Sequence, residues 1–102
     1  MSIKLQLATN VLALFIVSSV AEAQSFRLIE ATIDDVHAAL SSQQITCREL
    51  VKGYLNRIEA YDKEGPRLNS IQHVNSNAMQ IAESLDAAFS ESGFVGPLHC
   101  IP

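Results

Sequence analysis

Apolar side chains recur with a helical period in three parts of the chain, and polar or turn-forming residues separate these parts. The longest pattern is in the second part, where one broad apolar stripe is formed by Leu50, Val51, Tyr54, Leu55, Ile58 and Tyr61. Thr46 and Glu49 precede this stripe with the spacing of a capping box, so we predict that the helix begins at Thr46. Gly65-Pro66 should end it, because this dipeptide turns the chain.

The other two helical patterns are shorter or weaker. Before the long helix, Thr32 is a predicted cap with Asp35 three residues later, and the apolar face consists of Ile33, Val36 and Leu40. A polar break at 41–44 ends this helix. After the long helix, Asn75-Ser76-Asn77 is rich in capping residues, and the next apolar face consists of Ala78, Ile81, Ala82, Leu85 and Phe89. Gly93 should end this third helix, since glycine is the common helix terminator.

Residues 67–74 fit two patterns. Leu68, Ile71 and Val74 are three apart, as on one face of a helix. The shortness of the segment and the turn residues on both sides favour a β-strand instead, with alternate side chains on opposite faces. We therefore predict one short strand here.

Gly53 lies in the middle of the predicted second helix, where glycine costs about 1 kcal/mol relative to alanine. We predict that its missing side chain lets another backbone approach the helix closely. The alternative is a tolerated defect without a packing role.

The first 23 residues have the organisation of an export signal. Met1–Lys4 carries one positive charge, 11–17 is an unbroken apolar run, and Ala21-Glu22-Ala23 has small residues where a signal peptidase cuts. We predict a signal peptide at 1–23 with cleavage after Ala23, which leaves 24–102 as a secreted or periplasmic chain. The alternative is an uncleaved N-terminal segment that anchors the chain in a membrane, although the apolar run is short of the roughly 20 residues that a span needs.

The composition limits the partners that we expect. The chain carries a net charge of −4 and has no basic patch, so no nucleic acid or anionic lipid partner is predicted. No membrane association is expected after signal cleavage. A mature chain of this length buries only about 60% of its unfolded surface, so its stability alone should be marginal. The oligomeric state is left open.

Few side chains qualify as catalytic. Lys52 and Lys63 lie on the polar side or at the end of the second helix, which favours solvated lysines over general bases. Ser41-Ser42 lies in a polar break without a lysine partner, so a helix-ending role is favoured. We predict no catalytic residue and no cofactor-binding residue in this chain.

Three histidines and two cysteines raise the question of a metal site. His37, His73, His99, Cys47 and Cys100 show none of the spacings that zinc sites use, so no metal ligand is predicted. The cysteines of an exported chain could form a disulfide, but Cys47 begins a helix and Cys100 lies in a turn. We leave the pairing open, with separate small buried residues as the default.

The last residues resemble a known family. Gly96-Pro97-Leu98-His99-Cys100-Ile101-Pro102 looks like the Gly-Pro-Leu-x-Gly-Ile-Pro turn of the amidase signature family. Cys100 stands where that family usually has glycine; if the glycine serves a positive φ or a close backbone approach, cysteine there costs about 1 kcal/mol or more. Leu68-Asn69, and a helix carrying Ala82 and Asp86, fit the same family. So does the second helix, at Thr46, Glu49, Leu50, Val51, Tyr54, Leu55, Arg57 and Ile58.

This resemblance implies an α/β fold, the amidase signature fold, for the complete protein. Residues 24–102 would be the N-terminal part of that domain, truncated before the catalytic core, and mostly α, with three helices and one or two short strands. The family hydrolyses the carbon–nitrogen bond of amides with a serine nucleophile, a bridging serine and a lysine, all of which follow the Gly-Pro-Leu turn. A small-molecule amide substrate is therefore expected only for the complete enzyme, without a cofactor, and the 102-residue chain is expected to be inactive.

Two other functions stay open from the sequence. The chain could be a small secreted helical module that binds a partner without catalysis. It could also be the glutaminase subunit of a tRNA-dependent amidotransferase, a relative with the same fold. The predicted export signal counts against the second alternative, because that enzyme works in the cytosol.

Overall fold

Three α-helices and one π-helical turn make up the regular structure of residues 25–102, the part of the chain that the computed structural model describes. The predicted signal peptide at 1–23 lies outside this part. The elements are α1 (Ile33–Ser41), α2 (Cys47–Arg57), the π-helical turn η1 (Ile58–Lys63) and α3 (Ala78–Ser92). The order of elements confirms the three predicted helices. Within residues 25–102, no helix is long and apolar enough to cross a membrane.

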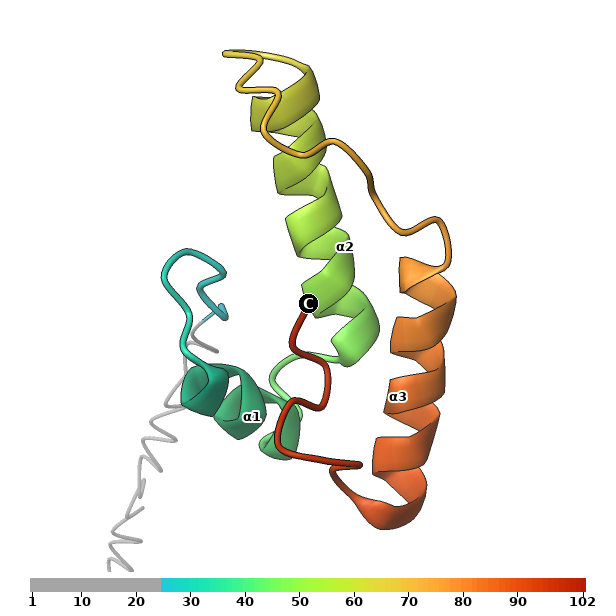
Figure 1. Ribbon diagram of the computed structural model, residues 1–102. Coiled ribbons are helices and arrows are strands. Elements are labelled where there is room, and N and C mark those ends of the chain that lie inside the picture. The colour runs from blue at the N-terminus through green and yellow to red at the C-terminus, as the bar shows by residue number, and fades with distance from the viewer. Residues whose placement is uncertain (1–24) are drawn as a thin grey trace, which may run out of the picture.

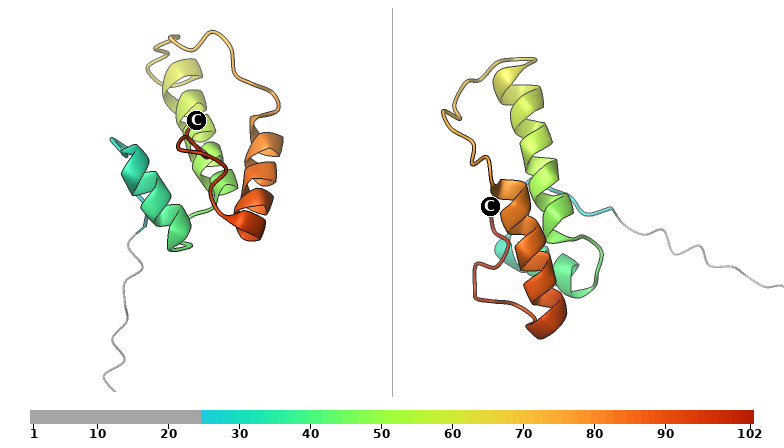
Figure 2. Two further views of the ribbon diagram at one scale, coloured as in Figure 1. Left: turned by 60° about the horizontal axis from the view of Figure 1, so that its bottom comes forward. Right: turned by 90° about the vertical axis from the view of Figure 1, so that its right-hand side faces the viewer.

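The helices form an antiparallel hairpin with a third helix across its base. α2 and η1 make one continuous rod, α3 runs back beside it, and α1 lies across the end at which α2 begins (Figure 1). The C-terminal segment, residues 93–102, turns back at the end of α3 and ends beside the hairpin (Figure 2). We call the end of the hairpin at Cys47 the closed end and the end at η1 the open end.

The predicted capping box of α2 and the predicted Thr32 cap of α1 are both present, and the α1 cap is a capping box as well. At the start of α1, the Asp35 N–H donates to Thr32 Oγ1 (3.1 Å) and the Thr32 N–H donates to Asp35 Oδ2 (2.9 Å). Thr46 and Glu49 repeat this arrangement at the start of α2, with the same two distances. The hydrogen bonds from the Thr32 and Thr46 backbones hold the pKa of Asp35 and of Glu49 below the ordinary values.

The apolar core lies at the closed end, where α1, α2, α3 and the C-terminal segment meet. Its buried members are Val36, Leu40, Cys47, Leu50, Val51, Ala82 and Cys100. Leu50 is fully enclosed, while Tyr54, Leu55 and Ile58 further along α2 and η1 are only partly buried. The apolar stripe of α2 is therefore covered over its first turns and uncovered toward the open end.

The π-helical turn decides which side chain faces inward at the open end. Our prediction placed Tyr61 on the stripe, but Tyr61 is 48% exposed and Asp62 only 4%. The Glu64 N–H donates to the Glu59 carbonyl (2.9 Å), which is one residue further back than in an α-helix. This extra residue shifts the register by one position, so Asp62 faces inward where Tyr61 was predicted.

The predicted strand at 67–74 is wrong, because residues 25–102 contain no β-strand. Arg67 and Asn69 have left-handed backbone, with φ of 52° and 50°, which is incompatible with an extended strand. The N–H groups of Leu68 and Asn69 donate to carbonyls near the end of η1, both at 3.1 Å. The segment folds back onto η1, and the described part of the chain offers it no neighbouring strand.

Gly53 does allow a close approach, although a side chain rather than a backbone uses the space. A β-carbon at Gly53 would lie 2.5 Å from Leu28 Cδ1. The Tyr54 hydroxyl donates to the carbonyl of the same leucine (3.1 Å). Leu28 therefore anchors the segment before α1 onto the middle of α2.

Cys47 and Cys100 form a disulfide, with their Cα atoms 5.7 Å apart, so the default of separate buried cysteines is wrong. The sequence separation of 53 residues is bridged because α3 returns the chain to the closed end (Figure 1). Cys100 also has a φ of 56°. The position is thus of the kind that favours glycine, which is the condition under which we predicted a backbone cost for cysteine.

Candidate functional site

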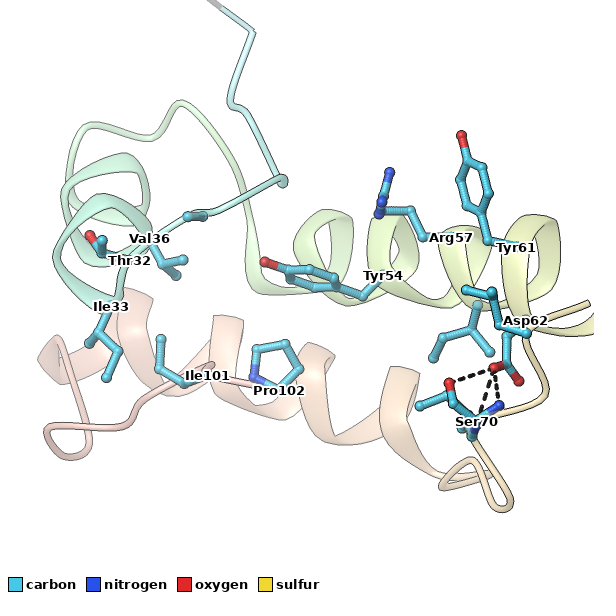
Figure 3. Close-up of a pocket in the computed structure, with 14 residues that line it drawn as sticks. Thr32, Ile33, Val36, Tyr54, Arg57, Tyr61, Asp62, Ser70, Ile101 and Pro102 are labelled. Atoms are coloured by element: carbon cyan, nitrogen blue, oxygen red, sulfur yellow. Dashed lines mark hydrogen bonds between the residues drawn. The ribbon is translucent and has the colours of Figure 1, made fainter. Parts of the chain in front are cut away.

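Two apolar grooves flank the end of the C-terminal segment, and Ile101 and Pro102 line both of them. The α1 groove, of about 620 Å³, lies between α1, the outer turns of α2 with η1, and the loop after η1 (Figure 3). The hairpin groove, of about 470 Å³, lies between α2 and α3. The Gly-Pro-Leu turn thus leads directly to the wall that the two grooves share.

Most of the large apolar side chains that stay exposed in residues 25–102 line these grooves. Those in the α1 groove are Ile33, Tyr61 and Leu68, and those in the hairpin groove are Val74, Ile81 and Leu98. Ile33 and Ile81 belong to the predicted apolar helix faces, and they are 42% and 48% exposed. Nothing within the described part of the chain lies over them, so the grooves extend the core outward as uncovered apolar surface.

Asp62 joins the outer end of the α1 groove to the loop after η1 (Figure 3). Its Oδ1 accepts hydrogen bonds from the Ser70 N–H (2.6 Å), from Ser70 Oγ (2.8 Å) and from the Ile71 N–H (3.1 Å). Lys63 Nζ lies 2.9 Å from Asp62 Oδ2 and donates to the Ile71 carbonyl (2.5 Å). One carboxylate and one ammonium group therefore hold the irregular loop against the helix.

The charge state of Asp62 follows from these contacts. Burial raises the pKa of its carboxyl, but the hydrogen bonds from Lys63, Ser70 and Ile71 outweigh burial and hold the pKa well below its usual range. A carboxylate with so low a pKa is a weak base, so the Ser70–Asp62 contact is poorly suited to activate the serine as a nucleophile. The cluster fits a structural role better than a catalytic one.

Asp86 of α3 caps the start of α2 from across the hairpin. Its carboxylate oxygens accept hydrogen bonds from the N–H groups of Cys47 (2.7 Å) and Arg48 (3.0 Å). The negative charge also lies at the positive end of the α2 dipole. The sequence marked Asp86 only as part of the family resemblance, because a partner 39 residues away leaves no local signal.

Two of the three histidines come together at the closed end. His37 Nε2 donates to the His99 carbonyl (3.0 Å), and the Val95 N–H donates to His99 Nδ1 (3.2 Å). The ring of Phe94 stacks on His37 with a centroid distance of 4.5 Å and meets His99 edge-on at 5.5 Å. His73 lies elsewhere, in the wall of the hairpin groove. Across residues 25–102, no group of three His, Cys, Asp or Glu side chains could hold a metal ion.

The other side chains considered from the sequence have ordinary structural positions. Lys52 is exposed on α2. Ser41 is the last residue of α1, and Ser42 Oγ donates to the Ala39 carbonyl (3.2 Å), which confirms the helix-ending role of this pair. Lys63 is exposed, as predicted, and it also contacts Asp62 and the Ile71 carbonyl.

Several known proteins are similar to the chain. The A subunit of the glutamyl-tRNA(Gln) amidotransferase of Halorhodospira halophila is 36% identical over 73 residues, which are 72% of this chain and 14% of that protein. A Schizosaccharomyces pombe protein with an amidase name is 33% identical over 79 residues, which are 78% of this chain and 13% of that protein. An Arabidopsis thaliana protein with an amidase name is 33% identical over 69 residues, which are 68% of this chain and 13% of that protein. No family model matches the chain, and no solved structure matches it significantly.

The chain spans about one seventh of the length of the curated relatives that it matches. These partial matches at low identity support an amidase-like chain and the amidase signature family. The mostly α structure of residues 25–102 agrees with the mostly α character that was expected for this part.

Proposed function

We propose that the chain is the N-terminal part of an exported amidase signature hydrolase that cleaves the carbon–nitrogen bond of amides. The observation that carries the proposal is the set of partial matches to proteins with amidase or amidotransferase names, which cover up to 78% of this chain. The Gly-Pro-Leu turn at 96–98 and the helix at Thr46–Ile58 supply the residue pattern within it.

In this proposal the catalytic groups lie outside the present chain. A serine attacks the amide carbonyl, a bridging serine and a lysine take up its proton, and backbone N–H groups stabilise the oxyanion that forms. The lysine can act as a base only where desolvation lowers its pKa. Lys52 and Lys63 do not qualify, since Lys52 is exposed and Lys63 is paired with Asp62.

The role of residues 25–102 would be to support that catalytic body. The α1 groove and the hairpin groove would receive its apolar side chains, and the turn at 96–102 would lead into the strand that carries the lysine. Covering an exposed leucine such as Leu68 or Leu98 stabilises a fold by roughly 25 cal/mol for each Å² of apolar surface removed from water. The uncovered grooves therefore support a scaffold role rather than a catalytic one for this part.

The disulfide supports an exported amidase over the cytosolic amidotransferase alternative. Disulfides form and persist in oxidising compartments, whereas cytosolic thiols are kept reduced. The Cys47–Cys100 bridge and the predicted signal peptide at 1–23 therefore favour the same location, either secreted or periplasmic.

Two measurements test the proposal. Reading the coding DNA beyond the Pro102 codon should reveal an in-frame lysine-bearing strand and a later serine- and glycine-rich segment. An immediate stop codon would favour the alternative, a small secreted helical module that binds a partner. The purified 102-residue chain should hydrolyse amides no faster than buffer, and measurable turnover would contradict the location that we give to the catalytic groups.

A further inference from the structure

The C-terminal segment is attached to the rest of the structure by few polar contacts. The His37 side chain donates one hydrogen bond to the His99 carbonyl. The N–H groups of Val95, His99 and Ile101 are all bonded within the segment itself. The Phe94 ring packs on His37 of α1 and on Phe89 of α3, and the disulfide from Cys100 to Cys47 is the segment's covalent attachment to α2.

The backbone at Cys100 works against this attachment. Its φ of 56° lies in the left-handed region, where a residue with a β-carbon is less stable than in extended or right-handed backbone. A free cysteine at position 100 would gain by leaving this conformation. The crosslink opposes that movement, because it keeps the Cys100 sulfur on the first residue of α2.

The hairpin, in contrast, has attachments of its own that do not involve the sulfurs. The Asp86 carboxylate accepts from the N–H groups of residues 47 and 48, and Arg48 Nε lies 2.8 Å from Glu83 Oε1. Ala82 of α3 is buried in the same cluster as Leu50 of α2. Loss of the disulfide therefore leaves the α2–α3 contacts in place.

We propose that the C-terminal segment is a redox latch, which the Cys47–Cys100 disulfide keeps on the hairpin and which detaches when the bridge is reduced. Reduction by a dithiol breaks the sulfur–sulfur bond, transfers two electrons and two protons to the cysteines, and leaves the dithiol as a cyclic disulfide. In the 102-residue chain, residues 93–102 then leave the closed end, while α2 and α3 remain paired. This inference does not depend on amide hydrolysis.

Release of the latch would change the molecular surface in a defined way. Ile101 and Pro102 form part of the walls of both the α1 groove and the hairpin groove, so both grooves lose a wall together. Both cysteines are buried, at 0% and 4% exposure, so a reductant reaches the sulfurs only after the segment has opened transiently.

Amide hydrogen exchange on the 102-residue chain tests the latch, because separate amides report on the segment and on the hairpin. The oxidised chain is compared with the same chain in dithiothreitol and with the Cys47→Ala/Cys100→Ala double variant. Protection of the His99 and Ile101 amides should fall by about 100-fold or more in both bridge-free forms. The amides of positions 47 and 48, which bond to Asp86, should keep most of their protection.

Two outcomes would overturn the latch. If His99 and Ile101 stay protected without the bridge, other contacts hold the segment. If the amides of positions 47 and 48 lose protection to the same extent, the bridge stabilises the hairpin as much as the C-terminal segment and is no latch. A second variant, Cys47→Ala/Cys100→Gly, isolates the backbone effect. The Ile101 amide should keep more protection in this variant than in Cys47→Ala/Cys100→Ala, and equal or lower protection would show that the left-handed backbone does not drive the release.

Discussion

The two ends of the rod formed by α2 and η1 carry the same apolar stripe but are stabilised differently. At the closed end, Leu50 and Cys47 are fully enclosed, α3 supplies a cap through Asp86, and a disulfide adds the C-terminal segment. At the open end, Tyr61 is about half exposed and a single inward carboxylate, Asp62, holds an irregular loop. The closed end has a buried apolar core, whereas the open end has uncovered apolar surface and a loop held by polar contacts to Asp62.

This difference shows what a periodic stripe can and cannot tell. The stripe reports which face of a helix is intended for packing, but whether that face is covered depends on segments that arrive from elsewhere in the chain. Here the covering segments, α1, α3 and residues 93–102, all reach the closed end. Substitutions at the two ends should therefore differ both in the size and in the kind of their effects.

Removal of the disulfide should give the largest effect. The bridge joins residues 53 apart, and in the chain-entropy model a loop of this length stabilises the folded state by at most about 4 kcal/mol, and by less where the α2–α3 hairpin stays folded without it. Urea denaturation of the oxidised and reduced chains, followed by circular dichroism, measures the difference. Equal midpoints would mean that the closed end does not need the crosslink.

Matched truncations of the stripe should differ strongly between the ends. Leu50→Ala leaves a cavity in the closed end and should cost about 3 kcal/mol of unfolding free energy. Tyr61→Ala removes a half-exposed side chain that faces away from the core and should change the unfolding free energy by about 0.5 kcal/mol or less. Similar costs in chemical denaturation would show that the open end is as well covered as the closed end.

Loss of the cross-hairpin cap should cost less. Asp86→Ala leaves two N–H groups at the start of α2 without their partner and should destabilise the chain by about 1.5 kcal/mol. Glu83→Ala is the matched control on the same helix, since it removes only an exposed ion pair with Arg48 and should cost about 0.5 kcal/mol or less. A larger loss for the control than for Asp86→Ala would contradict the assigned cap.

Glycine at position 100 should stabilise the chain relative to alanine once the bridge is absent. In a Cys47→Ala background, Cys100→Gly should be more stable than Cys100→Ala by about 1 kcal/mol, because φ is 56°. Thermal unfolding of the two double variants gives the comparison. Equal stability or the reverse order would show that the left-handed backbone at position 100 does not cost the folded chain stability.

The open end should respond to acid through Asp62. Its pKa is lower in the folded chain than in the unfolded chain, so its contribution to stability is complete above the unfolded value of about 4 and is lost as the pH falls below it. Asp62→Asn should lower the urea midpoint at pH 7, and the gap to the wild-type chain should narrow toward pH 2. A gap that does not change with pH would exclude the carboxylate charge as its cause. Because the loop is peripheral, we expect this to be the smallest loss of global stability.

Local chemistry made much of the fold predictable. Thr32 and Thr46 predict the starts of α1 and α2, because each has a capping carboxylate three residues later. Gly93 ends α3 where predicted. The sequence did not predict the Asp86 cap or decide the Cys47–Cys100 bridge, because both join distant residues, and it missed the π-helical turn that places Asp62 inward. The prediction of a strand at 67–74 was wrong because Asp62 accepts hydrogen bonds from this segment and Lys63 donates one to it, and these bonds outweigh the alternating pattern.

The left-handed backbone at Cys100 constrains the route by which the two cysteines could have been acquired. A chain that gained Cys47 first would carry a small enclosed thiol at the head of α2, with little disturbance. A chain that gained Cys100 first would carry at position 100 a side chain that the left-handed backbone disfavours, and no crosslink would compensate. Ancestral sequences with one cysteine should therefore have that cysteine at position 47 and glycine at position 100.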